Sequence, residues 1–433
     1  MNRRSALQFI AGAGSASVVA AGTGSRPLSQ GHQVRRDGPT SVGPDLPEVE
    51  RLVAARLGNF AKVPGCALAI TKQGRIVWAR AYGQRDLRAG RPFTLQTTHN
   101  IASITKTYMA TLVLTLVDKQ LIDLDADVND YLPYKLRSPF FSAVPITLRM
   151  MLSHTSGLAE VGPEPGPYAD SYRAGDLPAR DGEWARRCLA QRNHARHYVY
   201  PPETGFWLRD ARPGQVRSYS NLAWQPMTDV IKHVTGRDVH DKMRAALLKP
   251  LAIGDSGFRL ADADTEPALG YAAVVDGKVH NGLDFDYEYL YSRLEGSPEV
   301  KGFVEYARYT YDVFADGGMR TSLLSLAKYS AMWANGGALP GGRRVLSPSA
   351  VTAAFTLQAG EGQGTADHGQ GLGWGVSSRR PDGWVHGGGD LGTNTFALVL
   401  PKTQATVVAI SNVSRFPGGI DDLVFDVAER AGV

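Results

Sequence analysis

The sequence predicts an α/β fold of the α+β kind. One antiparallel sheet is built from both ends of the chain, is flanked by helices and carries an inserted, mainly helical lobe. Two strand patterns lie near the N-terminus, within residues 65–83, and three more lie within residues 371–412. Helical patterns fill much of the region between them. The chain has 433 residues, of which 43% are hydrophobic, so it can bury a large core.

The first 47 residues are typical of a leader and a linker. Residues 1–24 carry Arg3 and Arg4 ahead of a run of apolar and small residues that is too short and too rich in glycine for a stable membrane span. The run looks like a twin-arginine export signal, with a Sec-type signal as the alternative. Residues 25–47 are rich in Pro, Gly and Ser and predict a flexible linker. Residues 48–430 then form one domain, which we expect in the periplasm or outside the cell, without a membrane span once the signal is removed.

Composition excludes several classes of function. The formal net charge is +5, and it falls to +3 without Arg3 and Arg4, which is too little and too dispersed for nucleic acid. No Cys or His cluster has metal-ligand spacing, so we expect no metal and no cofactor. Cys66 lies in an apolar run and Cys188 in an expected helix; we expect two buried free thiols, with one disulfide permitted. The expected partner is a small-molecule or peptide substrate, bound by a monomer.

The folded body opens with a helix over residues 49–57 and two strands that turn at Gln73 and Gly74. Residues 99–120 then predict an amphipathic helix with one apolar stripe, formed by Met109, Leu112, Val113, Leu116 and Val117. Ser103 and Lys106 lie one turn apart at its start, so the hydroxyl and the amine can meet.

This pair is our candidate for a nucleophile and its activating base. Serine is a weak nucleophile at neutral pH, and a partly desolvated lysine can accept its proton. The helix N-terminus adds a positive field where an oxyanion would form. The Ser-x-x-Lys pattern occurs again at Ser325 and Lys328, within another expected helix and without further chemistry around it. Other motifs in the sequence must therefore decide which of the two copies is catalytic.

Later segments complete the outline. Residues 162–214 are irregular and rich in proline, with one expected helix at 183–191, and loops of this length often form the wall of a binding site. A helix closed by Gly236 follows. Residues 285–314 are crowded with aromatics, used mainly for core packing, with some available to line a substrate pocket. A closing amphipathic helix is expected at 420–431.

Three short motifs stand in order along the chain: SITK at 103–106, YSN at 219–221 and HGG at 386–388. They are accompanied by LSHTSGL at 152–158, ADGGMRTS at 315–322 and GLGWG at 371–375. The ordered set resembles the serine penicillin-recognising family, which includes class C β-lactamases, DD-peptidases, D-aminopeptidases and related esterases. The resemblance covers the chain from about Glu48 to the C-terminus. It implies a β-lactamase/transpeptidase-like fold and a serine hydrolase that works through an acyl-enzyme.

The resemblance assigns the proton-transfer roles residue by residue. Ser103 attacks the substrate carbonyl, and Lys106 takes or relays its proton. Tyr219 is the second base, which passes the proton to the leaving group and later activates water.

The resemblance also assigns the groups that hold the substrate. Asn221 bonds the lysine and the substrate amide. The glycines after His386, including Gly388, allow a substrate to approach an edge strand closely. The oxyanion hole is expected at the backbone N–H groups of Ser103 and Gly389.

Two departures from the family pattern affect substrate choice. His386 stands where many relatives carry lysine. With a reference pKa of about 6.5, a histidine is only partly charged at neutral pH. We therefore expect weak carboxylate binding, with a KM for carboxylate substrates that rises from about pH 6 to 8. We also expect small esters and uncharged D-amino-acyl amides to be better substrates than penicillins or peptides that end in free D-alanine. Pro226 should interrupt the first turn of the helix after Asn221.

Rival hydrolase classes have weaker support. The GDSG stretch at 254–257 resembles the nucleophile loop of trypsin-like proteases, but the following glycine and the disulfides are missing, so it is expected to be a turn. No G-x-S-x-G elbow is present, which argues against an α/β-hydrolase. The predicted function is an exported serine hydrolase acting on an ester or amide bond, as an esterase, a D-amino-acyl peptidase or amidase, or a DD-carboxypeptidase-like enzyme. The alternatives are a class C β-lactamase and a penicillin-binding sensor without turnover.

Overall fold

A computed structural model describes residues 39–58, 63–158, 172–175, 207–263, 267–280, 297–311, 313–358 and 369–433. All of them belong to one unit that begins at Asp37. The expected leader lies outside the described residues, as do the helix expected at 183–191, Cys188 and the aromatic residues Tyr287, Tyr289 and Tyr291.

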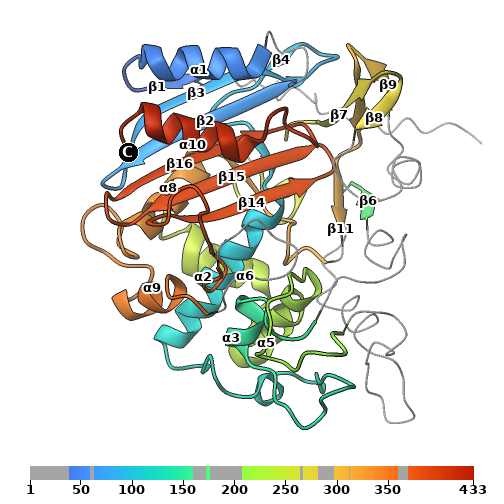
Figure 1. The fold of residues 1–433 in the computed structure, drawn as a ribbon, viewed down its shortest axis with the longest axis vertical. Coiled ribbons are helices and arrows are strands. Elements are labelled where there is room, and N and C mark those ends of the chain that lie inside the picture. The colour runs from blue at the N-terminus through green and yellow to red at the C-terminus, as the bar shows by residue number, and fades with distance from the viewer. Residues whose placement is uncertain are drawn as a thin grey trace, which may run out of the picture. The chain divides into compact units, whose positions relative to one another are not determined.

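An antiparallel sheet drawn from both ends of the chain forms the centre of the fold (Figure 1). Its strands lie in the order β1-β3-β2-β16-β15-β14-β13, with β4 beside β3. Their bounds are β1 Ser41–Val42, β2 Gly65–Lys72, β3 Arg75–Asp86, β4 Arg91–Pro92, β13 Gly375–Val376, β14 Trp384–Asp390, β15 Thr393–Leu400 and β16 Ala405–Ser411. N-terminal β2 pairs directly with C-terminal β16, with Cys66 opposite Ser411. The predicted sheet built from both termini is confirmed.

Alternate residues of the central strands enter two separate apolar cores, as the period of two in a strand requires. In β16, Val407 and Ala409 join one core, while Val408 and Ile410 join the other. Helices α1 (Pro47–Leu57) and α10 (Ile420–Arg430) cover the first face, and α8 (Leu323–Ala334) packs on the second (Figure 1). Burial on both faces explains why β2 and β16 read as almost continuous apolar runs.

Helix α2 (Thr105–Asp118) follows β5 (Thr98–Asn100) and a 3-10 turn at Ala102–Ile104. Every residue from Thr105 to Leu116 is buried, so the prediction of an amphipathic helix with one apolar stripe is wrong for most of its length. The polar face is buried because its hydroxyls find partners inside the protein. Thr107 and Thr111 donate to carbonyls of the preceding turn, and both also bond the hydroxyl of Tyr329.

The other helices gather around α2 and form the helical lobe (Figure 1). They are α3 (Leu148–Leu152), α5 (Pro226–Thr235), α6 (Val239–Met243) with a π-helical turn at Arg244–Leu248, and α9 (Pro348–Ala354). Pro226 is the first residue of α5 and follows a 3-10 turn at Leu222–Trp224. The predicted interruption is confirmed, because proline fits the first helical position, where no N–H is needed. The predicted end at Gly236 is confirmed by its left-handed φ of 68°.

A second sheet and two strand pairs were not evident in the sequence. The neighbouring strands of this sheet are, in order, β8 (Lys278–His280), β7 (Gly270–Val275), β10 (Phe303–Tyr306) and β9 (Ser297–Val300). The pairs are β6 (Tyr172–Ala174) with β11 (Tyr309–Tyr311), and β5 with β12 (Arg320–Ser322). Strands this short give little periodicity to read. The described aromatics of this region are buried, as expected for core packing: Phe303, Tyr306, Tyr309, Tyr311 and Phe314.

Two boundaries differ from the predictions. Ser41 and Val42 lie in the expected linker, but they pair with β3, and the Arg80 guanidinium holds this segment by donating to the Val42 carbonyl and the Asp45 carboxylate at 3.0 and 2.7 Å. In the strand pattern at 371–380, only Gly375–Val376 pairs with β14. Within the described residues, none of the helices is long and apolar enough to cross a membrane.

Candidate active site

Ser103 sits at the end of a tight turn between β5 and α2. Its neighbour Ala102 has a φ of 44°, in the left-handed region that an alanine enters at a cost of about 1–3 kcal/mol. The Asn100 side chain stabilises this turn by accepting a hydrogen bond from the Ala102 N–H at 2.8 Å. Ser103 is half-buried, whereas both flanking residues are buried. The turn therefore leaves the hydroxyl accessible at the start of the buried helix.

Lys106 is fully buried, and each of its three ammonium protons has an acceptor. Its Nζ donates to Ser103 Oγ at 3.0 Å, to Asn221 Oδ1 at 2.5 Å and to the Asp316 carbonyl at 2.8 Å. A buried cation is tolerated only when its donors are satisfied in this way. The Asp316 carbonyl comes from the ADGGMRTS segment, to which sequence reasoning gave no role of its own.

Tyr219 reaches the same oxygen from the other side. Its hydroxyl donates to Ser103 Oγ at 2.9 Å, and its ring centroid lies 5.0 Å from the Lys106 ammonium. Asn221 begins the 3-10 turn that leads into α5, which places its amide against the lysine. The structure thus brings together Ser103, Lys106, Tyr219 and Asn221, as the motif order predicts.

His154, from the LSHTSGL segment, is the residue that sequence reasoning missed. Its ring stacks on Tyr219 with centroids 4.4 Å apart and planes 26° apart. Its carbonyl accepts from the Ser218 N–H at 2.8 Å, and its Nδ1 accepts from the Ser220 N–H at 3.2 Å. Burial lowers the pKa of His154 well below its usual value, so the neutral ring keeps Nδ1 as an acceptor. His154 therefore fixes the backbone on both sides of Tyr219.

Strand β14 brings its glycines against the turn that carries Ser103. A Cβ on Gly388 would meet the Ile101 carbonyl oxygen and Thr395 Oγ1, both at 2.4 Å, so only glycine fits there. Gly389 is exposed and a Cβ on it would have open space around it. Glycine is therefore required at Gly388, where β14 packs closely against the Ser103 turn. At Gly389 the lack of a side chain leaves the backbone of the strand exposed to solvent.

His386 is half-buried on β14, and its chemistry differs from the prediction. Burial, reinforced by the nearby Lys106 ammonium, lowers the pKa of His386 to about 3. The prediction of a partly charged ring is therefore wrong, because the imidazole is neutral at neutral pH. Its Nδ1 lies 2.7 Å from the Gly387 carbonyl, which can only accept, so Nδ1 carries the proton and Nε2 is left as an acceptor.

The rival serines have structural partners. In α8, Ser325 Oγ donates to Asp255 Oδ1 at 2.6 Å, and Lys328 Nζ lies 3.4 Å from the Ala252 carbonyl instead of near the serine. Ser256 is buried and shares a hydrogen bond of 2.6 Å with Thr321. The second Ser-x-x-Lys and the GDSG turn therefore hold α8 in place. Among the described residues, no group of three or more His, Cys, Asp or Glu is placed to hold a metal ion.

Comparison with known proteins shows the family of this chain. The Beta-lactamase family description matches residues 49–428. Esterase EstB from Burkholderia gladioli is 30% identical over 47% of this chain and 49% of its own length. Penicillin-binding protein 4 from Amycolatopsis lactamdurans is 26% identical over 89% of this chain and 90% of its own. The chain thus matches only about half of EstB but nearly all of the second relative.

A solved structure shares the fold. The octameric penicillin-binding protein homologue from Pyrococcus abyssi superposes with a TM-score of 0.67, at 22% identity, over 90% of this chain and 78% of its own. The predicted β-lactamase/transpeptidase-like fold is confirmed. The chain belongs to the Beta-lactamase family.

Proposed function

We propose that this protein is an exported hydrolase that cleaves an ester or amide bond through an acyl-enzyme on Ser103. One observation carries the proposal: Ser103 Oγ lies within hydrogen-bond distance of a cation, Lys106 Nζ at 3.0 Å, and of a group that can move its proton, Tyr219 OH at 2.9 Å. Ser325 and Ser256 lack any such pair of partners in the described structure.

Acylation begins when Ser103 Oγ attacks the carbonyl carbon of the substrate. Lys106 with three engaged N–H donors has no lone pair to offer, so we assign the base to Tyr219 in its phenolate form, which the nearby Lys106 ammonium stabilises. The phenolate oxygen takes the proton of Ser103 Oγ across the 2.9 Å between the two oxygens and becomes the neutral hydroxyl. Collapse of the tetrahedral intermediate breaks the bond to the leaving group. The Tyr219 proton passes to the departing oxygen or nitrogen.

The oxyanion of the intermediate is assigned to the backbone N–H groups of Ser103 and Gly389. Ser103 precedes the N-terminus of α2, whose dipole favours negative charge, and Gly389 is exposed beside Gly388, which packs on the Ser103 turn. In deacylation, Tyr219 takes a proton from water, which attacks the acyl carbonyl, and the proton then returns to Ser103 Oγ. Asn221 orients the substrate amide.

The substrate class follows from His386. A neutral ring with Nε2 as an acceptor suits a hydrogen-bond donor of the substrate and offers no charge to a carboxylate. We therefore assign small esters and uncharged D-amino-acyl amides as the preferred substrates. The name of the relative EstB supports an ester substrate. The name of penicillin-binding protein 4 is the reason to include a β-lactam among the compounds tested.

Burst kinetics with a chromogenic ester test the proposal. We expect one rapid equivalent of product, followed by steady turnover, and no release above background in Ser103→Ala. A burst without turnover would support the alternative of a penicillin-binding sensor. Faster turnover of a cephalosporin than of any ester or amide would support the class C β-lactamase alternative.

The remaining proposals concern the cellular setting. We propose that residues 1–24 are a twin-arginine export signal and that the mature protein is a periplasmic or secreted monomer. Replacing Arg3 and Arg4 with lysine should trap the protein inside the cell, as measured by fractionation. Light scattering after gel filtration measures the oligomeric state, and an octamer would contradict the monomer.

A further inference from the structure

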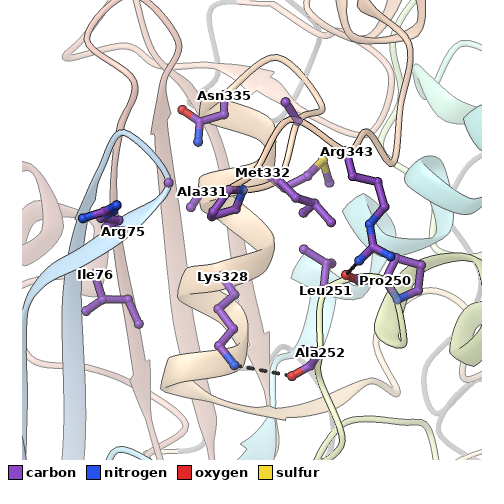
Figure 2. A pocket seen from close by; sticks show the side chains of 14 residues that line it. Arg75, Ile76, Pro250, Leu251, Ala252, Lys328, Ala331, Met332, Asn335 and Arg343 are labelled. Carbon is purple, nitrogen blue, oxygen red and sulfur yellow. Dashed lines mark hydrogen bonds between the residues drawn. The ribbon is translucent and has the colours of Figure 1, made fainter.

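A cavity lies against α8, and neither Ser103 nor its hydrogen-bond partners line it. It holds about 450 Å³ and lies between the hairpin of β2 and β3, helix α8, the segment at Pro250–Ala252 and the loop around Arg343 (Figure 2). This volume is within the range of about 300–1,000 Å³ that is usual for small-molecule sites. None of Ser103, Lys106, Tyr219, Asn221 or His386 lines it.

The floor of the cavity is apolar and comes from three different parts of the chain. Ala331 and Met332 of α8 are buried at 3% and 1% exposure, and Leu251 and Ile76 face them from the neighbouring segments (Figure 2). The rigid helix and the two-stranded hairpin hold this surface in place.

The rim of the cavity is positively charged. Its charged residues are Arg75, Lys328 and Arg343, all exposed, and no acidic residue lines the cavity. Lys328 Nζ lies 3.4 Å from the Ala252 carbonyl, and the Arg343 guanidinium donates to the Pro250 carbonyl, so both cations are turned toward the same edge (Figure 2). Within the described part of the chain, none of the three forms an ion pair with a carboxylate.

We propose that this cavity binds a small organic anion that has an apolar tail, such as a medium-chain carboxylate. The apolar floor would take the tail, and Lys328 and Arg343 would face the anionic group at the Pro250–Ala252 edge. Charge complementarity selects an anion over a neutral or cationic ligand of the same shape. The site is separate from the proposed hydrolytic site, so it does not depend on which bond Ser103 attacks.

The test compares three probes that share one tail and differ in the head group. Octanoate, octanamide and octylammonium are titrated by calorimetry into the full chain carrying Ser103→Ala, in low salt. Octanoate should bind at least about fivefold more tightly than octanamide, and octylammonium should bind most weakly. Equal affinity for octanoate and octanamide would overturn the proposal.

Variants assign the binding to this cavity. Lys328→Ala or Arg343→Ala should weaken octanoate binding about three- to fivefold, as expected for one exposed charge contact, and leave octanamide unchanged. Ala338→Phe, at a half-buried lining position, should block part of the cavity and weaken binding of both probes at least about tenfold. The matched control is Arg344→Ala, because Arg344 is the exposed neighbour of Arg343 but does not line the cavity. Octanoate binding that Ala338→Phe leaves unchanged, or that weakens equally in Arg344→Ala, would contradict the assignment.

Discussion

Replacing Tyr219 with phenylalanine removes one hydroxyl from the proposed proton path and little else. The ring keeps its stack on His154 at 4.4 Å, and the backbone on either side keeps its bonds to that histidine. Ser103 Oγ loses the bond of 2.9 Å to the tyrosine but keeps the bond of 3.0 Å from Lys106, so no buried acceptor is left without a partner. The native geometry should therefore survive the change.

The expected loss is kinetic. A general base contributes about 10²- to 10⁴-fold, so kcat should fall at least 10²-fold, which corresponds to about 2.7 kcal/mol in the barrier. KM should change less than about threefold, because Asn221 and β14 are untouched. The free energy of unfolding should fall by no more than about 1 kcal/mol, the net value of one hydrogen bond.

Stopped-flow and steady-state hydrolysis of a p-nitrophenyl ester, with thermal melting in parallel, measure all three quantities. Tyr134→Phe is the matched control, since it removes a tyrosine hydroxyl that donates to Asp229 at 3.0 Å instead of to Ser103. A Tyr219→Phe protein whose kcat stays within threefold of the parent would refute the role of the tyrosine. In that case Lys106 would have to act as the base without it.

Four further predictions concern Ser103, His386, Gly388 and His99. Ser103→Ala should abolish labelling by a serine-directed fluorophosphonate, as read by intact-protein mass spectrometry, whereas Ser325→Ala should leave it unchanged; labelling that tracks Ser325 would exclude the assignment. Because burial lowers the pKa of His386 to about 3, its charge should not change between pH 6 and 8. The KM for a carboxylate substrate divided by the KM for a matched neutral ester should therefore be constant over this range, and His386→Lys should lower this ratio. A ratio that changes with pH in the parent would show that the ring titrates there. Gly388→Ala should reduce kcat/KM at least tenfold by pushing β14 from the Ser103 turn, since the added carbon would lie 2.4 Å from a backbone oxygen; full activity would mean that the strand need not touch the turn. Burial lowers the pKa of His99 to about 4, against about 6.5 in the unfolded chain. The stability that the neutral ring contributes is therefore present above pH 6.5 and lost toward pH 4, at up to about 1.4 kcal/mol per pH unit. His99→Gln should make the melting temperature depend less on pH between pH 4 and 6.5, and an unchanged slope would contradict this prediction.

The sequence was enough to predict what depends on local spacing or on motif order. Ser103 and Lys106 meet because three residues make about one helical turn, and this is independent of the rest of the fold. Tyr219 lies 116 positions from Ser103, and its place could be expected only from the order of the motifs. Strands β2 and β16 were readable because their apolar runs are long.

The features that the sequence missed depend on tertiary surroundings. The pKa of His386 follows from its burial beside Lys106, which no local pattern of residues reveals. The polar face of α2 looks exposed in a helical projection, but its threonine hydroxyls are satisfied by carbonyls and by Tyr329 from another helix. His154 acts through stacking and backbone contacts with a segment more than 60 positions away, and the only sequence signal was the LSHTSGL segment itself.

The pairing of β2 with β16 also determines when the central sheet can form during synthesis of the chain. Ser411 bonds the carbonyl of Gly65, 346 positions earlier, so the N-terminal hairpin has its neighbour in the sheet only after nearly the whole chain has been synthesised. Until then the apolar faces of β2 lack their partner strand, and contacts of such long range make folding slow. A chain shortened at its C-terminus before β16 would divide the sheet into two parts and leave β2 as an open edge prone to aggregation.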